Sequence, residues 1–186
     1  MEDCIFCKIA EGKLPSYKIL EDEEHLVFLD IYPIVKGQTL IITKKHFDSY
    51  QFNLPDDVYT KLFLFAKKVG KILENALEAK RVFLVVEGTE VKHIHIKLYP
   101  VYKVNSNVSP KIIDTLSKDI KENWYNGYIA TLHGERASDE ELKEISEKVR
   151  KHVKKSKFEN IFLLHQKHLS EKAISKNEKR YSYYQS

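Results

Sequence analysis

The chain has 186 residues, of which 42% are hydrophobic and 31% are charged, and it carries a formal net charge of +4. This composition is that of a soluble globular protein, and the length allows one domain with an extension, or two small units, to bury a substantial core. Lys and Glu alternate along most of the chain, so we expect solvated surface and no nucleic-acid partner. The apolar runs are too short to span a bilayer, which argues against a membrane-embedded protein.

The N-terminal segment is acidic and has no long apolar run behind it, which argues against a signal peptide and predicts a cytoplasmic protein. Cys4 and Cys7 are the only cysteines in the chain. In a reducing compartment their spacing indicates a metal pair or two free thiols rather than a structural disulfide. Residues 4–11 are expected to form a short helical turn, which Pro15 ends.

Short strands and one long helix are expected in the next part of the chain. Residues 17–20, 25–30 and 38–43 are apolar or β-branched between turn residues, so each is predicted to be a strand. A helix is predicted to start at 53–57, where a proline and two acidic residues stand, and to run to about Ala79. Its apolar residues recur at spacings of three and four, which predicts one buried stripe. They are Val58, Leu62, Phe65, Val69, Ile72 and Ala76.

Two further strands are expected to pair as an antiparallel hairpin. The first, at 81–86, is apolar from Val82 onward and is predicted to be buried. Residues 87–90 form a tight turn into the second, at 91–100. Pro100 has no N–H group to offer a neighbouring strand, so it is expected to end the second strand.

The strand at 91–100 carries an unusual polar face. Because side chains alternate along a strand, His93, His95 and Lys97 share one face, and the apolar residues between them share the other. Two imidazoles and an ammonium group next to one another favour a chemical role. A solvated polar face is the alternative.

The residues after 104 are predicted to form an extension. A polar linker at 104–109 marks the boundary, and a helix starts at Pro110. A strand is expected at 127–132, and a second helix follows the capping box at 138–141. The chain then divides into a domain at 1–104, a helical extension with one strand at 105–169, and a polar tail at 170–186 that is expected to be disordered.

Four stretches of the sequence together resemble the histidine-triad (HIT) family of nucleotide hydrolases and transferases. The family motif is His-φ-His-φ-His-φ-φ, with φ apolar, and here it reads His93-Ile-His95-Ile-Lys97-Leu-Tyr. The first two histidines match, and Lys97 stands in place of the third. The other stretches are Cys4-Ile-Phe-Cys7-Lys-Ile, Phe28-Leu-Asp30-Ile-Tyr-Pro33 and Gly37-Gln-Thr-Leu-Ile-Ile-Thr-Lys-Lys-His46. The resemblance covers residues 1 to about 103.

The resemblance implies an α+β fold with a five-stranded antiparallel sheet and one long helix, to which a C-terminal α/β extension is added. It also implies a homodimer formed through the long helix and the adjacent strand. The implied activity is hydrolysis of a nucleoside phosphate ester, anhydride or phosphoramidate through a nucleotidyl-histidine, with a purine nucleotide favoured. A nucleotidyltransferase or phosphorylase, and a catalytically weak zinc-stabilised nucleotide-binding module, are the alternatives.

His95 occupies the position of the family's nucleophile, the middle histidine. Transfer through histidine needs a neutral imidazole nitrogen that attacks phosphorus, while the other ring nitrogen is held as a donor, usually to a carbonyl group. A buried structural histidine is the alternative. Lys97 brings a fixed positive charge, which can stabilise the transferring phosphate.

Cys4, Cys7, His46 and His93 resemble the ligand set of the zinc-binding members of the family. Two thiolates and two imidazoles make a closed tetrahedral set. The resemblance therefore implies a structural Zn²⁺ that pins the N-terminal segment against the catalytic strand and does not activate water. Two buried free thiols with an exposed His46 are the alternative.

Three residues resemble those that hold the nucleoside in the family. Asp30 is expected to accept hydrogen bonds from the ribose hydroxyls, and an Asx turn before Pro33 is the local alternative. Phe28 and Ile31 are expected to sandwich the base, although their residue types also suit a core.

Glu90 is a departure from the family, because it replaces a Ser that contacts the region of the scissile phosphate. We assign Glu90 to the substrate site, where its carboxylate repels a phosphate unless Lys92 or Lys97 pairs with it. His133 lies in an aromatic and basic stretch of the extension. A packed strand is favoured there over a binding face.

Overall fold

The computed structural model describes residues 3–88, 90–102 and 133–155. By its internal contacts the chain divides into two compact units, Met1–Val149 and Arg150–Ser186. Only residues 150–155 of the second unit are described, so the sheet and the site below belong to the first. Among the described residues, no helix combines the length and the apolar character that crossing a membrane requires.

Five antiparallel strands form one sheet, as predicted. They are β1 (Lys18–Glu21), β2 (His25–Leu29), β3 (Thr39–Thr43), β4 (Arg81–Val85) and β5 (His95–Val101). Their order across the sheet is β1-β2-β3-β5-β4. The strand that carries His95 and Lys97 therefore lies between two others, which holds its backbone on both sides.

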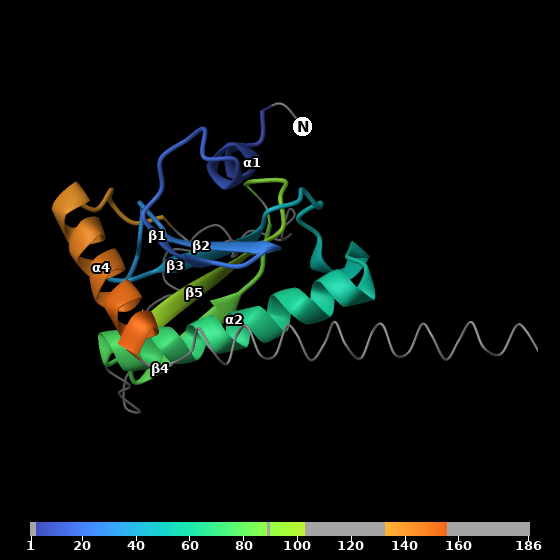
Figure 1. Ribbon diagram of the computed structural model, residues 1–186. Helices are drawn as coiled ribbons and strands as arrows, with labels where there is room; N and C mark the ends of the chain where they lie inside the picture. The colour runs from blue at the N-terminus through green and yellow to red at the C-terminus, as the bar shows by residue number, and fades with distance from the viewer. Residues whose placement is uncertain (1–2, 89, 103–132, 156–186) are drawn as a thin grey trace, which may run out of the picture. The chain divides into compact units, whose positions relative to one another are not determined.

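Helices cover both faces of this sheet. The short helix α1 (Ile5–Ala10) and the long helix α2 (Asp56–Leu77) lie on opposite sides of it in Figure 1. A 3-10 helix, η1 (Gln51–Asn53), precedes α2, and the helix α4 (Asp139–Lys155) belongs to the extension. The long helix predicted from the apolar stripe is confirmed, and it ends at a left-handed residue, Glu78.

The apolar stripe of α2 is buried as predicted, except at Val58 in the first turn, which is only partly buried. Leu62, Phe65, Val69 and Ile72 are each at most 4% exposed. The ring of His25, at the start of β2, stacks on Phe65 with the ring centroids 4.7 Å apart. Burial of such side chains contributes about 1.5–3 kcal/mol each, so the long helix is firmly fixed to its face of the sheet.

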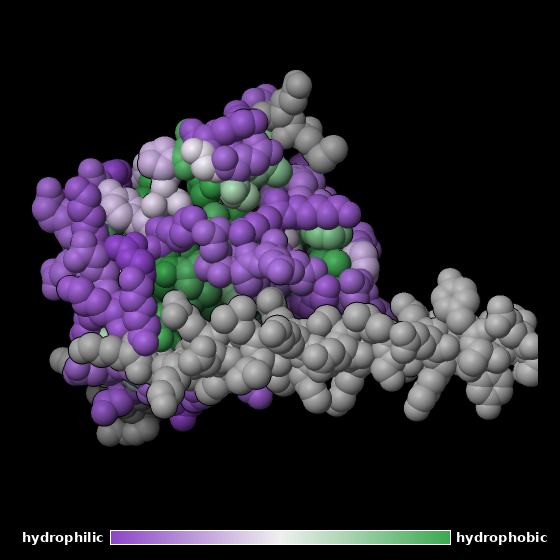
Figure 2. Space-filling model, viewed as in Figure 1, coloured by the Kyte–Doolittle hydropathy of each residue, from purple (hydrophilic) through white to green (hydrophobic). Residues whose placement is uncertain are grey.

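The short helix α1 covers the other face through one aromatic side chain, that of Phe6. This ring packs among Leu26, Phe28, Leu40 and Ile42, which come from β2 and β3. In Figure 2, hydrophobic residues lie directly beneath α1 and are framed by hydrophilic surface. The helix α1 thus covers the part of the hydrophobic core that lies on its own face of the sheet.

The strand predicted at 81–86 forms as β4, but the prediction that it is buried is wrong. Among the strands of the described residues it pairs only with β5, and it stands last in their order across the sheet. Phe83 and Leu84 are 54% and 42% exposed. An apolar strand has the same sequence pattern whether it is covered by its own domain or by a second molecule. The sequence alone therefore does not predict which of the two covers it.

The histidine strand is shorter at its start than the predicted 91–100. β5 begins at His95, and His93 precedes it in a bend, where its N–H donates to the carbonyl of Val91 (2.7 Å). The side chain of His93 is nevertheless fully buried. The bend turns this histidine away from a regular ladder position.

The prediction that Pro100 ends the strand is wrong by one residue. Pro100 lies inside β5 and pairs with Val82 of β4, and the strand ends at Val101. On its other side β5 pairs with β3 only as far as Leu98. No strand of residues 3–88, 90–102 or 133–155 lies beside Pro100 on that side, so the missing N–H of the proline breaks no ladder among them.

The helix predicted after residues 138–141 is α4. The N–H of Glu141 donates to the hydroxyl of Ser138 (3.1 Å), which caps the first turn. Leu142, Ile145 and Val149 form its buried stripe. The linker at 104–109, the helix from 110, the strand at 127–132 and the tail at 170–186 lie outside the described residues.

Candidate metal centre and active site

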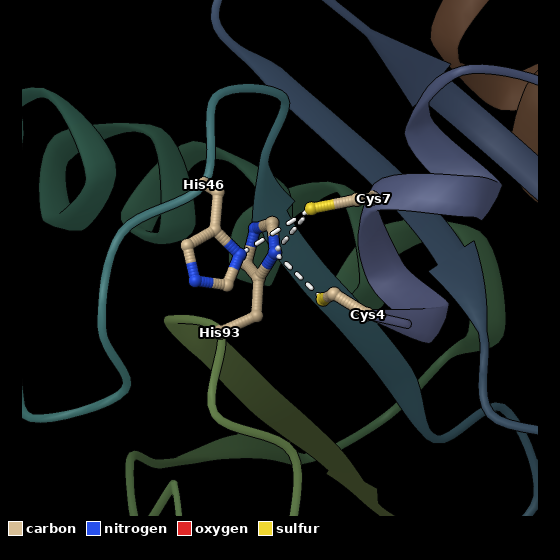
Figure 3. A group of neighbouring side chains, drawn as sticks. All are labelled: Cys4, Cys7, His46 and His93. Atoms are coloured by element: carbon tan, nitrogen blue, oxygen red, sulfur yellow. Dashed lines mark hydrogen bonds between the residues drawn. The ribbon is translucent and has the colours of Figure 1, made fainter. Parts of the chain in front are cut away.

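Four side chains that are far apart in the sequence converge at one end of the sheet. Cys4 caps α1 and Cys7 lies in its first turns, His46 follows β3, and His93 precedes β5. Figure 3 shows these four side chains pointing toward one another. Their ligand atoms all lie within 4.8 Å of one another. The structure therefore brings together the complete set that the sequence predicts as metal ligands.

The spacing of these atoms fits a tetrahedral metal ion. The Sγ atom of Cys7 lies 3.3 Å from Nδ1 of His46 and 3.5 Å from Nδ1 of His93, and Sγ of Cys4 lies 3.4 Å from Nδ1 of His93. A zinc ion with Zn–S bonds of about 2.3 Å and Zn–N bonds of about 2.0 Å has sulfur–nitrogen edges of about 3.5 Å. The donor set needs little movement to hold such an ion.

A backbone carbonyl on the side away from the thiols fixes the orientation of the His93 ring. Its Nε2–H donates to the carbonyl of Thr43 (2.8 Å), so the lone pair of Nδ1 faces the two thiols. Burial lowers the pKa of His93 to about 4, and the bond to Thr43 opposes this only in part. The imidazole is therefore neutral at pH 7 and able to donate its lone pair to a metal.

The thiol pair also favours a cation. Burial raises the pKa of the Cys7 thiol, and the hydrogen bond and charge of Cys4 raise it further. Two adjacent thiolates repel one another unless a positive charge lies between them. A cavity of about 420 Å³ opens beside the cluster and has Cys4, His46 and Glu90 among its lining residues. Solvent and small ligands therefore reach the cluster.

A backbone carbonyl fixes the tautomer of His95. It pairs with Ile42 across the sheet, so it projects to the α1 side, where the Phe6 ring lies 5.1 Å away edge-on. Its Nδ1–H donates to the carbonyl of His93 (2.7 Å). Nε2 then carries the lone pair, and it has no hydrogen-bond partner among the described residues.

The environment keeps the His95 ring neutral. The residue is 4% exposed, and burial lowers its pKa. The bond to the His93 carbonyl opposes this shift, Lys97 adds to it, and the carboxylates of Glu87 and Asp30 oppose it. Nε2 of His95 is not among the side-chain polar atoms of the described residues that are fully buried without a hydrogen-bond partner. Because it has no partner in that part of the chain, it is still accessible to solvent.

Lys97 forms a buried ion pair with Glu87. It lies two residues beyond His95 on the same face and donates to the carboxylate of Glu87, and both side chains are 7% exposed. Such a pair fixes the direction of the ammonium group and offsets its charge. The sequence gives no sign of this contact, because Glu87 lies in an acidic turn with no local partner.

Asp30 forms the Asx turn that the sequence offers as an alternative. Its Oδ1 accepts the N–H of Tyr32 (2.9 Å), and its Oδ2 accepts the side-chain amide of Gln38 (2.6 Å). A carboxylate has further lone pairs, so these bonds still leave room for a hydroxyl donor. Ile31 is 37% exposed beside it, whereas Phe28 is 4% exposed within the core.

Glu90 has a partner that the sequence does not predict. Its carboxylate accepts the ring Nε2–H of His133 at 2.7 and 2.6 Å. The expected partners were Lys92 and Lys97, and the structure pairs Lys97 with Glu87 instead. Contacts of this kind join segments far apart in the chain, and no periodicity or spacing signals them.

Sequence comparison places this geometry in a known family. The HIT domain profile matches residues 11–104. An uncharacterized HIT-like protein of Mycoplasma pneumoniae is 33% identical over 127 residues, which are 66% of this chain and 88% of that protein. An adenosine 5′-monophosphoramidase of Candida albicans is 36% identical over 106 residues, which are 52% of this chain and 69% of that protein.

Comparison of structures gives the same result for the fold. A hypothetical histidine triad nucleotide-binding protein of Sulfolobus tokodaii has a TM-score of 0.64 and 24% identity, with 83% of this chain and 94% of that chain covered. The sheet order, the helices on its two faces and the match over residues 11–104 agree with one another. The chain belongs to the HIT family.

Proposed function

We propose that this protein hydrolyses a nucleoside phosphate ester, anhydride or phosphoramidate, with Nε2 of His95 as the nucleophile. The observation that carries the proposal is the bond of 2.7 Å from Nδ1–H of His95 to the carbonyl of His93. It fixes the proton on one ring nitrogen and leaves the lone pair on the other. Burial, which lowers the pKa of this imidazole, keeps that lone pair available at neutral pH.

The reaction has two displacement steps. The lone pair of Nε2 attacks the phosphorus of the nucleotide, an N–P bond forms, and the leaving group departs with the electrons of its bond and takes up a proton. Water then attacks the phosphorus of the nucleotidyl-histidine. The N–P bond breaks, its electrons return to Nε2, and the nucleoside monophosphate leaves. The bond to the His93 carbonyl stabilises the ring while it is charged.

The role of Lys97 is to direct a donor at the reacting phosphate. Its ammonium group is anchored by Glu87, and this pairing reduces the net charge that the two residues present. We therefore infer that Lys97 contributes through the position of its N–H groups more than through long-range attraction. Asp30 and Ile31 hold the ribose and the base on the same side of the sheet, with Phe28 beneath them.

We further propose that Cys4, Cys7, His46 and His93 hold a structural zinc ion. The support is the donor set, its sulfur–nitrogen distances of 3.3–3.5 Å, and the bond from His93 to Thr43 that aims its lone pair at the thiols. When bound, the ion supplies a crosslink between α1 and the start of β5. All four positions of a tetrahedron are filled by protein atoms, so the set leaves no coordination site for a reacting water.

The test uses adenosine 5′-phosphoramidate, because a relative 36% identical to this chain is an adenosine 5′-monophosphoramidase. We expect the protein to release AMP, and His95→Ala to reduce the rate about 1,000-fold or more because the nucleophile is lost. His152→Ala, which removes an imidazole of α4 with no assigned role, is the matched control.

Two additions to this assay identify the mechanism. A substrate labelled at the α-phosphate is expected to leave label on the protein in a denaturing gel, and His95→Ala is expected to leave none. Added inorganic phosphate tests the second candidate, a phosphorylase, which Lys97 in place of the third triad histidine favours. A nucleoside diphosphate product would assign that reaction, and AMP release unchanged in His95→Ala would exclude both.

A further inference from the structure

Asp30, where the proposed nucleoside loop begins, lies on the same face of the sheet as the proposed nucleophile. Strand pairing places Phe28 of β2 and Lys97 of β5 in one row across the sheet, on either side of β3. Asp30 follows Phe28 by two residues, and its N–H donates to the carbonyl of Gln38 (2.9 Å), which continues the pairing of β2 with β3. Residues two apart in a strand share a face and stand about 7 Å apart. Asp30 therefore lies one row beyond Lys97, on the face that carries His95.

A buried amide holds the loop at 30–34 from the inside. The side chain of Gln38, which is 2% exposed, donates its N–H to Oδ2 of Asp30 (2.6 Å). Its Oε1 accepts the N–H of Ile34 (2.8 Å), and Oδ1 of Asp30 accepts the N–H of Tyr32 (2.9 Å). These bonds close the loop on itself and fix the carboxylate of Asp30 in one orientation.

The extension holds the same loop from the outside, through a supporting segment at 134–137. The N–H of Gly134 donates to the carbonyl of Tyr32 (3.1 Å), and the N–H of Ala137 donates to the carbonyl of Ile31 (3.0 Å). The contact is close, because a Cβ atom on Gly134 would lie 2.0 Å from the next carbonyl oxygen of the loop. The supporting segment and the loop therefore meet backbone against backbone.

The side chains of the loop stay exposed although its backbone is held on both sides. Ile31, Tyr32 and Ile34 are 37%, 45% and 50% exposed. Apolar and aromatic side chains beside a fixed carboxylate are the groups that bind a base and a ribose. Because the loop is ordered before a ligand arrives, binding does not have to include the entropy cost of ordering it.

We propose that the supporting segment is a positioning element, which holds the loop at 30–34 in the conformation that binds the nucleoside part of a nucleotide. Its residues set the affinity for the nucleoside and leave the chemistry at His95 unchanged. This inference rests on the proposed function, in which Asp30 and Ile31 hold the ribose and the base. It gives the extension a role in the recognition of substrate.

The first test is Gly134→Ala, whose added methyl group must displace the supporting segment from the loop. We expect the dissociation constants of AMP and adenosine, measured by calorimetric titration of the full chain, to rise equally and about tenfold. A loop that holds its binding conformation about a tenth of the time binds about tenfold more weakly. With adenosine 5′-phosphoramidate, KM should rise while kcat stays within about twofold, because substrate and transition state lose the same contacts.

Gly70→Ala is the matched control for this substitution. Gly70 lies in α2, and beyond its own helix backbone no atom of the described residues lies within 4 Å of where its methyl group would stand. The same chemical change is therefore accommodated there, and both dissociation constants are expected to stay within about twofold.

A second variant and a second measurement do not depend on the added methyl group or on activity. Ala137→Pro removes the N–H that donates to the loop, and it is expected to weaken AMP and adenosine binding in the same way. Hydrogen exchange then reports on the loop directly. The amides of Asp30, Tyr32 and Ile34 donate within it, so exchange over 30–38 should accelerate in both variants, while exchange in β5 should not change.

The outcomes distinguish this inference from the proposed function. If exchange over 30–38 is unchanged in a folded variant, the supporting segment does not hold the loop and the inference is wrong. If exchange accelerates but adenosine and AMP bind as before, or kcat falls and KM does not change, the inference is also wrong, and the label on His95 still decides the chemistry. If Gly134→Ala does not fold, Ala137→Pro decides. If the unaltered protein binds neither ligand and releases no AMP, the proposed function is overturned, and this inference with it.

Discussion

At the scale of single residues, the orientation of His95 depends on hydrogen bonds made by backbone groups. Its ring is held by the carbonyl of His93, and the ring of His93 is held by the carbonyl of Thr43. Carbonyl acceptors leave no choice of tautomer, because each must receive an N–H. The protonation pattern at the two histidines is therefore a property of the fold and does not depend on a neighbouring side chain.

A buried histidine outside the site, His25, contributes to a prediction on stability. Asp22 accepts hydrogen bonds from the backbone N–H groups of Glu24 (2.9 Å) and His25 (2.6 Å) and from Nδ1 of His25 (3.0 Å). Burial raises the pKa of Asp22, but these bonds outweigh it and hold the pKa below its usual 3.8. We expect Asp22→Ala to lower the free energy of unfolding by about 2 kcal/mol at pH 7.

The pH dependence of that loss follows from the sign of the shift. A carboxyl whose pKa is lowered by folding stabilises the protein above its unfolded pKa, and the contribution is lost as the pH falls through the folded value. The difference between Asp22→Ala and the unaltered protein should thus hold from pH 7 to about 4.5 and shrink below the usual carboxyl pKa. Urea unfolding measures it. Glu23→Ala, next to it and exposed, is the control, and an equal effect there would contradict the assignment.

At the scale of elements, α1 is fixed by two features that act together, the Phe6 ring and the cysteine pair. The helix has only six residues, too few to be stable in isolation. We predict one zinc ion per chain by elemental analysis. Its removal by a chelator, which the adjacent cavity admits, should lower the free energy of unfolding by about 3 kcal/mol or more.

Variants identify the ligands. Cys7→Ser should lose the metal and the added stability, whereas Lys8→Ala, on the same helix, should keep both. A metal content unchanged in Cys7→Ser would show that the ion is bound elsewhere. A metal-free protein of full stability would favour two free thiols.

The exposed edge of the sheet gives a prediction on assembly. Among the described strands β4 pairs on one side only, with β5, and its Phe83 and Leu84 are 54% and 42% exposed. An uncovered apolar edge strand invites pairing with another strand. We propose that a second copy of the chain covers β4 and that the protein is a homodimer.

Light scattering after size-exclusion chromatography tests the dimer. Phe83→Glu is expected to give a monomer, because it places a charge in the interface. Phe52→Glu changes a side chain that is 69% exposed in η1, and it is expected to leave the dimer intact. A monomeric unaltered protein, or a Phe83→Glu variant that still dimerises, would contradict the assignment.

At the scale of the whole molecule, the sequence predicts what is periodic or locally signalled. The stripe of α2, the cap at Ser138 and the five strands were all accessible in this way, because each depends on neighbours within a few residues. The four metal ligands were accessible through a resemblance, and the structure brings them together. The burial of β4 was not, since a continuous apolar run does not say what covers it.

The contacts that the sequence does not reveal are ion pairs between distant segments. Glu87 and Glu90 lie in one acidic turn, and nothing local indicates that one meets Lys97 and the other His133. Long charged side chains have many conformations, and only the packed backbone selects among the available partners.

One residue, His93, contacts both the candidate metal site and the proposed nucleophile, His95. Its ring aims at the cysteines, while its carbonyl oxygen receives the proton of the His95 ring two residues later. If removal of the ion displaced this peptide, the imidazole of His95 would rotate with it. An enzyme built this way would lose turnover when stripped of its ion, and an assay would report a metalloenzyme. The metal would nevertheless act only by keeping the His95 ring aligned through His93. It would take no part in the bond changes of the reaction.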